Sequence, residues 1–119
     1  MLYHKKVCIP ADVKIQVLSI INKFQYHPLA FTTHAKEQLR EELNPVELAK
    51  ALYHYSFDYN DIFEVNQEGR EVEKIGFRIP FDNRDIAFII TKEKSIVTIW
   101  TNNKGDKHAT LDKQVYAMA

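Results

Sequence analysis

Apolar residues recur every three or four positions in the first half of the chain and close to every second position in the second half. The first spacing is typical of amphipathic helices, and the second is typical of half-buried strands. The helical spacing is most regular between Ala11 and Phe24, where the polar residues fall on the opposite side. Pro10 precedes this segment and Pro28 follows it, so we predict a helix over 11–24.

Two further helices are predicted before residue 56. One extends from Thr33 to Leu43, and Thr32 or Thr33 can cap it because a threonine hydroxyl accepts a hydrogen bond from an early backbone N–H. The next has a clear start in the segment 44–47, where Asn-Pro-Val-Glu supplies a capping residue, a first-turn proline and an acidic residue. We expect this helix to reach about His54.

The period falls toward two from about Ser56 onward, where β-branched and aromatic residues become frequent. Strands are predicted over 61–67, 72–81, 86–91 and 95–101. The segments between them are short and polar, and short links favour antiparallel neighbours because parallel strands need a long crossover. The pattern therefore predicts a four-stranded antiparallel meander.

The strand over 72–81 alternates most clearly between apolar and polar residues. Its apolar face is expected to pack against the helices and consists of Ile75, Phe77, Ile79 and Phe81. The opposite face carries Arg78, and Trp100 of the last strand is expected to join it there. In that last strand we expect Ile96 to point the same way as Trp100, and Ile99 to point the other way.

These patterns predict an α+β fold in which two or three N-terminal helices pack on a roughly four-stranded antiparallel sheet, followed by a short C-terminal helix or tail. The length of 119 residues suits one domain. We expect a single domain over 1–119, with 1–28 as an N-terminal helical extension and 29–116 as a helix–helix–sheet core.

Composition narrows the class further. The single cysteine excludes an intramolecular disulfide framework, and no apolar run approaches the ~20 residues of a membrane-spanning helix. We therefore expect a cytoplasmic protein that does not contact membranes. The formal net charge is zero, with 16 basic and 16 acidic residues, whereas strong nonspecific binders of nucleic acid are usually basic.

Several kinds of site are absent from the sequence. The three glycines are too scattered for a phosphate-binding loop, no His-x-x-x-His pair offers a helical zinc site, and there is no Gly-x-Ser-x-Gly elbow. No metal and no cofactor are expected. Histidines with basic and hydroxyl companions remain as candidates.

His34 and His108 are the candidate acid–base residues. His34 stands at the start of a predicted helix, where the positive end of the helix dipole favours the neutral imidazole that acts as a general base. His108 follows the last strand in a stretch rich in hydrogen-bond donors, including Lys104 and Thr110. The alternative for His34 is a structural role, in which the side chain only caps or packs at the helix start. The alternative for His108 is a solvated loop, followed by a last helix that Thr110 caps.

Arg78 and Trp100 are the candidate substrate contacts on the sheet. A guanidinium suits bidentate contact with a phosphate, and an indole can stack on a base. The alternatives are an ordinary exposed arginine and an indole that packs at the rim of the core.

A resemblance rests on short motifs. The sequences FTTHA at 31–35, QLR at 38–40 and NPVEL at 44–48 resemble the opening of a family of small bacterial and phage domains of unknown function. IVTIW at 96–100 and DKHATLD at 106–112 resemble the ending of its phage and prophage members. The resemblance covers about 29–116.

The match is incomplete, because many members carry an arginine–glycine pair where this chain has Glu42 and Leu43. The order of elements in the family is similar to that of the barnase, RelE and colicin-like ribonuclease toxins. The resemblance therefore implies metal-independent cleavage of RNA, as by a toxin or phage effector.

In that interpretation His34 and His108 exchange protons with the substrate, Arg78 clamps the phosphate, and Lys104 or Thr110 is an auxiliary donor. The implied partners are RNA and a protein, which is either a cognate inhibitor or a host target. The alternative is a non-catalytic protein-binding module of phage or mobile-element origin, which neutral charge and many aromatic residues favour. Either protein could form a homodimer through an exposed sheet edge or apolar face.

Overall fold

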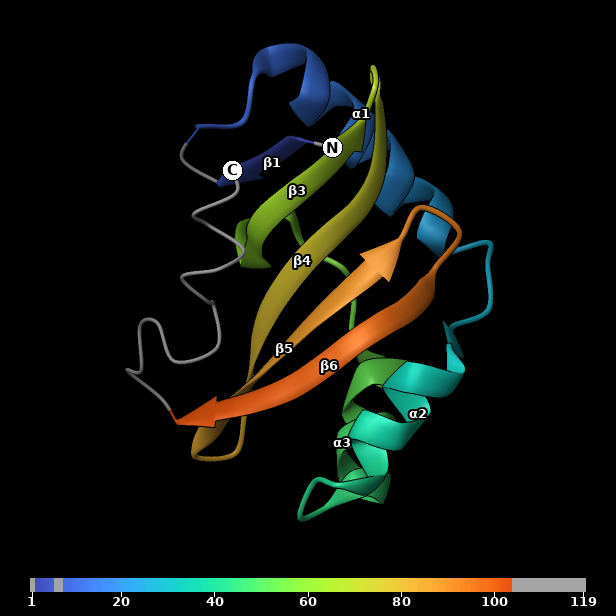
Figure 1. The fold of residues 1–119 in the computed structure, drawn as a ribbon, viewed down its shortest axis with the longest axis vertical. Coiled ribbons are helices and arrows are strands. Elements are labelled where there is room, and N and C mark those ends of the chain that lie inside the picture. The colour runs from blue at the N-terminus through green and yellow to red at the C-terminus, as the bar shows by residue number, and fades with distance from the viewer. Residues whose placement is uncertain (1, 6–7, 104–119) are drawn as a thin grey trace.

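A six-stranded sheet organises the computed structural model, which describes residues 2–5 and 8–103 (Figure 1). The helices are α1 (Ala11–Phe24), α2 (Thr33–Arg40) and α3 (Pro45–His54), and a 3₁₀ turn, η2, covers Tyr59–Asp61. The strands are β1 (Leu2–Lys5), β2 (Ala30–Phe31), β3 (Ile62–Glu68), β4 (Glu71–Phe81), β5 (Arg84–Thr91) and β6 (Ser95–Asn103).

The strand order is β1-β3-β4-β5-β6-β2. The predicted antiparallel meander is present as β3 to β6, each strand pairing with the next along the chain. The predicted number of four strands is too low, because β1 pairs antiparallel with β3 and β2 pairs parallel with β6. These strands have four and two residues, too few to show a period of two in the sequence.

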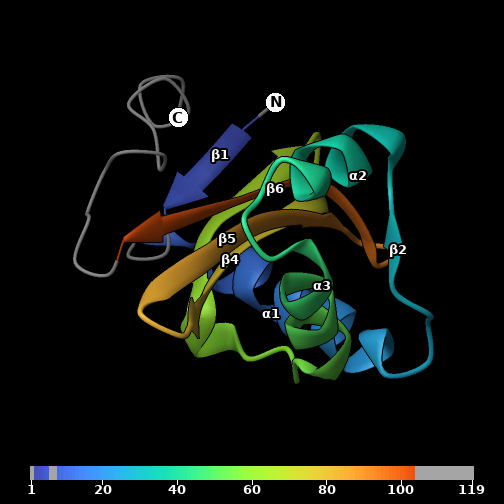
Figure 2. The same ribbon diagram turned by 90° about the horizontal axis from the view of Figure 1, so that it is seen from below.

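Helices α1 and α3 lie on one face of the sheet, as Figure 2 shows. They bury their apolar residues against the face of β4 and β5 that carries Phe77 and Phe88, whose rings stack at 5.5 Å. The core residues from the helices are Val13, Val17, Phe24, Ala35, Leu48 and Leu52. The predicted apolar face of β4 is confirmed, since Ile75, Phe77 and Ile79 are all buried there.

Helix α2 runs beside the edge of β6 beyond the short β2. The side chain of Gln38 accepts a hydrogen bond from the backbone N–H of Ile99 at 3.0 Å, and the hydroxyl of Thr101 donates to Glu42 at 2.9 Å. An unpaired strand edge is a template for unwanted pairing. Helix α2 and the residues just after it therefore satisfy polar groups of β6 that β2 is too short to reach.

The predicted helix ends are mostly confirmed. Helix α1 has the predicted bounds, and Thr32 caps α2 by accepting from the backbone N–H of Ala35 at 3.2 Å. Helix α2 ends at Arg40 instead of Leu43. Pro45 opens α3 as predicted, but the Asn44 side chain makes no capping hydrogen bond.

The segment 1–28, predicted as a helical extension, belongs to the same sheet and core as the rest. Its strand β1 pairs with β3, with Leu2 opposite Gln67 and Lys5 opposite Glu64. Its helix α1 supplies buried core residues. The predicted C-terminal helix or tail, and the end of the predicted core at 116, lie outside the described residues.

A bulge in β6 changes the predicted sides of its residues. Ile90 of β5 is opposite Ile96, whereas the preceding Ile89 is opposite Thr98, so Val97 is the extra residue. As a result Ile96 and Ile99 are both buried against the helices. The prediction that Ile96 points the same way as Trp100 is wrong for this reason.

Candidate functional site

Arg78 and Trp100 lie on the same face of the sheet, opposite α1 and α3, which we call the outer face. Arg78 of β4 is in register with Ala87 of β5, and Ala87 is in register with Trp100 of β6. The neighbouring residues Phe77 and Phe88 point to the helices, and side chains alternate along strands. The register therefore separates the two candidate substrate contacts by one alanine.

Two small residues form the floor of the outer face. Ala87 is fully buried, and Gly76 leaves space that the Phe63 ring fills, since a β-carbon at position 76 would lie 2.7 Å from Phe63 Cζ. The rings of Phe63 and Trp100 meet edge to face with centroids 6.3 Å apart. They make a second aromatic cluster, on the side of the sheet away from the helices.

Glu64 is the buried titratable residue of this face. It is in register with Gly76, and its Cγ would lie 2.9 Å from a β-carbon at that position. Its exposed fraction is 4%, and burial raises the pKa of its carboxyl to about 7. Neither Glu64 Oε2 nor Trp100 Nε1 has a hydrogen-bond partner among the residues that the structure describes.

Glu64 was not among the site residues predicted from the sequence. A glutamate between Phe63 and Val65 fits the alternation of a strand that has one solvent-exposed face. That alternation does not show how deeply the glutamate side chain is buried. The available signal was Gly76 in the neighbouring strand, because a glycine inside a strand often marks close approach of another group.

The charge of Arg78 is balanced within the outer face. Its Nε donates to Asp85 Oδ2 at 3.0 Å, and the two side chains are 19% and 18% exposed. A shallow hollow of 410 Å³ lies beside this ion pair and is lined by Phe63, Arg78 and Asp85 together with residues of η2 and of the end of β4. A phosphate bound here would have to compete with the Asp85 carboxylate.

The described residues do not bring His34 and Arg78 together. His34 is exposed in the first turn of α2, beside the edge of β6, whereas Arg78 is on β4. Strand β5 lies between β4 and β6, and two strand spacings alone amount to ~10 Å. Lys104, His108 and Thr110 lie outside the described residues, so the predicted approach of His34 and His108 stays a prediction.

A different surface exposes apolar residues. Leu43, Val46 and Tyr53 are 83%, 63% and 60% exposed. Val46 and Tyr53 are seven residues apart and lie on one side of α3, and Leu43 lies in the link that leads into this helix. We call these three residues the α3 stripe. It lies where α2 and α3 meet at the lower end of Figure 1, and the Tyr53 ring approaches Phe31 at 6.0 Å between centroids.

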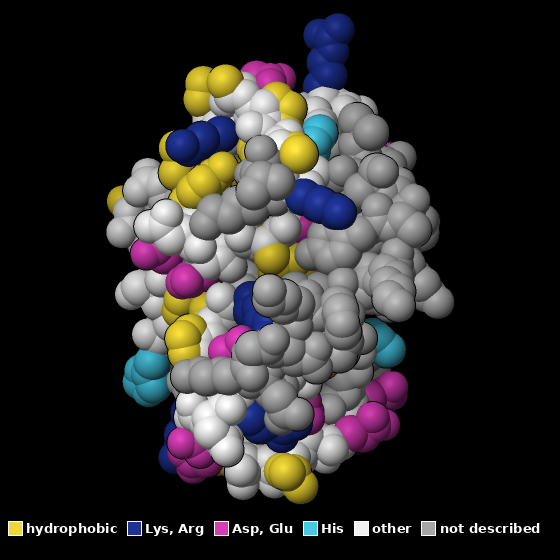
Figure 3. Space-filling view, turned by 90° about the vertical axis from the view of Figure 1, so that its left-hand side faces the viewer, with side chains coloured by type: hydrophobic (Ala, Val, Ile, Leu, Met, Phe, Trp, Pro, Cys, Tyr) yellow, Lys and Arg dark blue, Asp and Glu magenta, His cyan; other side chains and the backbone are white. Residues whose placement is uncertain are grey.

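Charged side chains of both signs lie beside the α3 stripe and on the face that Figure 3 shows. Glu47 and Lys50 are 65% and 64% exposed and lie 3.9 Å apart. On the face that Figure 3 shows, the basic and acidic side chains that are coloured are interspersed, without a continuous basic area among them. Strong electrostatic attraction of nucleic acid depends on such an area.

Comparison of the chain with family models, curated proteins and solved structures finds no match. Among the described helices, none combines the length and apolar character that crossing a membrane requires. Within 2–5 and 8–103, no group of three or more His, Cys, Asp or Glu side chains could hold a metal ion. The proposals below therefore rest on the geometry of this chain.

Proposed function

We propose that this protein is a non-catalytic binding module that contacts another protein through the α3 stripe. The observation that carries the proposal is the exposure of Val46 and Tyr53 on one side of α3, with Leu43 exposed in the link that leads into this helix. Exposed apolar groups that lie together, rimmed by polar residues, mark protein interaction sites. Tyrosine in particular is enriched where proteins bind each other.

The charge around the stripe defines the kind of partner. Glu47 and Lys50 cancel each other beside the stripe, and the whole chain is neutral. The matching surface is therefore an apolar, uncharged patch on a folded protein or on an amphipathic helix. The charged pair beside the α3 stripe carries no net positive charge that would attract a polyanion such as a nucleic acid.

The stripe is also separate from the core, which makes it testable. Helix α3 is held by Leu48 and Leu52, whose exposed fractions are 1% and 2%, on the side that faces the sheet. Substitutions at Val46 and Tyr53 can therefore remove the binding surface and keep the packing of Leu48 and Leu52, although the Tyr53 substitution also removes the ring contact with Phe31.

The test uses a Val46→Lys/Tyr53→Lys variant. A protein captured by the wild-type chain from an extract of its own host should be identified, purified and titrated against both chains by calorimetry. We expect the double variant to bind at least about 100-fold more weakly, because truncation of interface anchors commonly costs 2 kcal/mol or more. Ile15→Lys on α1, where Ile15 is 69% exposed, is the matched control and should bind like the wild type.

Two outcomes would reject the proposal. One is equal affinity of the double variant and the wild type for the purified partner. The other is a loss of affinity of the same size in Ile15→Lys, which would show that added charge alone weakens binding. Sedimentation of the pure chain distinguishes a second copy from a different protein as the partner.

A second candidate function is metal-independent cleavage of RNA on the outer face. The observation that favours it is the placement of Arg78 and Trp100 on one face, with the Phe63 ring against Trp100. Phosphate contact and base stacking are both needed to hold single-stranded RNA. Exchange of Asp85 for phosphate at Arg78 would be the first step of binding.

Incubation with RNA in EDTA, with and without ribosomes, tests this candidate. Cleavage that disappears in Arg78→Ala and persists in Val46→Lys/Tyr53→Lys would support it. RNA that stays intact with the wild-type chain under both conditions would exclude it.

A further inference from the structure

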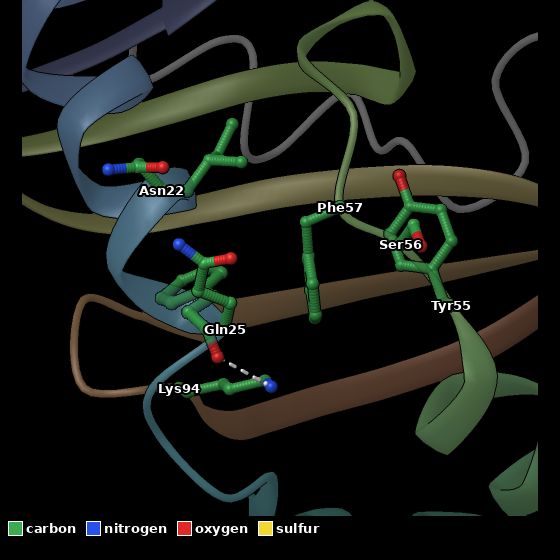
Figure 4. A pocket seen from close by; sticks show the side chains of 8 residues that line it. Asn22, Gln25, Tyr55, Ser56, Phe57 and Lys94 are labelled. Atoms are coloured by element: carbon green, nitrogen blue, oxygen red, sulfur yellow. Dashed lines mark hydrogen bonds between the residues drawn. The ribbon is translucent and has the colours of Figure 1, made fainter.

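A cavity of 370 Å³ opens between the end of α1, the segment that follows α3, and the turn between β5 and β6 (Figure 4). Its lining residues are Ile21, Asn22, Phe24, Gln25, Tyr55, Ser56, Phe57 and Lys94. The volume is at the lower end of the range for small-molecule sites, ~300–1,000 Å³. The cavity is separate from the outer face and from the α3 stripe, because none of its lining residues belongs to either.

An aromatic wall fixes one side of the cavity. The Phe57 ring is half-buried and is held edge to face by Phe24 and Tyr55 at 4.9 Å each and by Phe77 at 5.3 Å. In Figure 4 the ring stands between Gln25 and Tyr55 with one face toward the end of α1. This flat apolar surface is preformed, since three core or half-buried rings prevent it from turning.

The rim of the cavity is polar, with Asn22 and Gln25 on the α1 side of the ring and Ser56 beside Tyr55 on the other side (Figure 4). Asn22, Gln25 and Ser56 are exposed, and their side chains make no hydrogen bond to other described residues. Two amides and a hydroxyl offer both donors and acceptors. They can recognise a polar group of a ligand but provide no negative charge to it.

Lys94 supplies a positive charge at the base of the cavity. Its Nζ donates to the backbone carbonyls of Phe24 at 2.8 Å and His27 at 2.9 Å, which leaves one of three N–H donors. It lies 5.5 Å from the Phe57 ring centroid and forms no ion pair with a described carboxylate. Its full charge exceeds the roughly half negative charge at the end of α1.

The backbone holds Lys94 in place. Its N–H donates to the Thr91 carbonyl at 2.9 Å, and its own carbonyl accepts from Ala30 at 3.1 Å. Its φ of 68° lies in the left-handed region. The ammonium is therefore positioned before any ligand arrives, which lowers the entropic cost of binding.

We propose that this cavity binds a small organic anion in which a flat apolar group carries a carboxylate, the flat group lying against Phe57 and the carboxylate accepting from Lys94. Gln25, which lies between Asn22 and Lys94 in Figure 4, is the lining amide that can donate to the second carboxylate oxygen. The cation and the ring are close enough that one small molecule reaches both. This inference does not depend on the protein-binding role of the α3 stripe.

Phenylacetate is the probe for this site. Titration of the isotopically labelled full chain, followed by amide chemical shifts, should give saturable changes at Asn22, Gln25, Phe57 and Lys94, with a dissociation constant on the order of 1 mM. Phenylacetamide lacks the charge and acetate lacks the ring, so each should bind at least about 10-fold more weakly.

Gln25→Glu is the decisive variant because it places a negative charge at the rim without disturbing the Lys94 hydrogen bonds. It should weaken phenylacetate binding by about 10-fold. Ser19→Glu adds the same charge to α1 at an exposed residue outside the lining and should leave the affinity unchanged. Lys94→Asn, which tolerates the positive φ, should abolish binding, with circular dichroism to verify the fold.

Three results would overturn the proposal. The first is the absence of saturable shifts at these residues with phenylacetate up to tens of millimolar, well above the expected constant. The second is equal binding of phenylacetate and phenylacetamide. The third is an unchanged affinity in Gln25→Glu. None of these results would bear on the binding of a protein to the α3 stripe.

Discussion

The outer face and the α3 stripe contain opposite kinds of residue in opposite environments. The outer face carries the groups that chemistry needs, yet Arg78 is paired with Asp85 and the Glu64 carboxyl is buried. The α3 stripe carries no reactive group, yet its three residues are all more than half exposed. Residue type alone therefore makes the outer face look like the better binding site. Its charged groups are paired or buried, whereas a partner can reach the residues of the α3 stripe.

The largest effect expected from a change on the outer face concerns Glu64. The pKa of its carboxyl is about 7 in the fold against an ordinary value of 4.5. The folded state therefore binds this proton more tightly than the unfolded state does, and the corresponding stability is lost as pH rises from about 4.5 through about 7.

Glu64→Gln removes this dependence on pH. Relative to the variant, the wild type should lose about 3 kcal/mol of unfolding free energy between pH 4.5 and pH 8, as urea denaturation at both values would measure. The same loss in both chains would show that Glu64 is solvated, and the outer face would then be as accessible as the α3 stripe.

Gly76→Ala tests how tightly the outer face is packed. The added methyl group would meet Phe63 Cζ at 2.7 Å, so the ring must move. We expect a loss of about 1–3 kcal/mol in unfolding free energy, part of which Phe63→Leu should restore in the double variant. A neutral Gly76→Ala would mean that the Phe63 ring is loosely held and that the floor of this face is open.

Arg78→Ala tests whether the ion pair is structural. It leaves Asp85, which is 18% exposed, without its bond to Nε, and should cost about 1.5 kcal/mol. Asp85→Asn with Arg78 intact is the complementary variant. If Arg78→Ala stabilises the chain, Arg78 is held at a cost to folding, which is typical of residues that serve a ligand.

The smallest effect on stability is expected at the α3 stripe. Val46→Lys and Tyr53→Lys replace side chains that are 63% and 60% exposed, so each should change the unfolding free energy by no more than about 0.5 kcal/mol. Leu48→Ala on the buried side of the same helix should cost about 2–5 kcal/mol. Large losses from both lysine substitutions would place the stripe in the core.

Long periodic elements of the fold were predictable from the sequence. The bounds of α1 follow from its apolar spacing and the flanking Pro10 and Pro28, and the alternation in β4 identified its buried face. The bulge at Val97 was not predictable, because an extra residue in one strand is defined only by its pairing with β5.

The candidate site was predictable in part. Alternation placed Arg78 on the correct face, but the distance between Arg78 and His34 depends on β5 and β6 lying between them, which is a property of topology. The depth of Glu64 depends on its neighbours, Gly76 and Phe63, in three dimensions. The exposure of Leu43, Val46 and Tyr53 was likewise not predictable, because apolar spacing does not distinguish an exposed apolar residue from a buried one.

Calorimetric titration of the purified partner against two variants tests the central claim most directly. We expect Val46→Lys/Tyr53→Lys to lose at least about 100-fold in affinity and Arg78→Ala to bind like the wild type. The reverse pattern, with binding lost in Arg78→Ala and kept in the stripe variant, would show that the partner binds the outer face and not the α3 stripe.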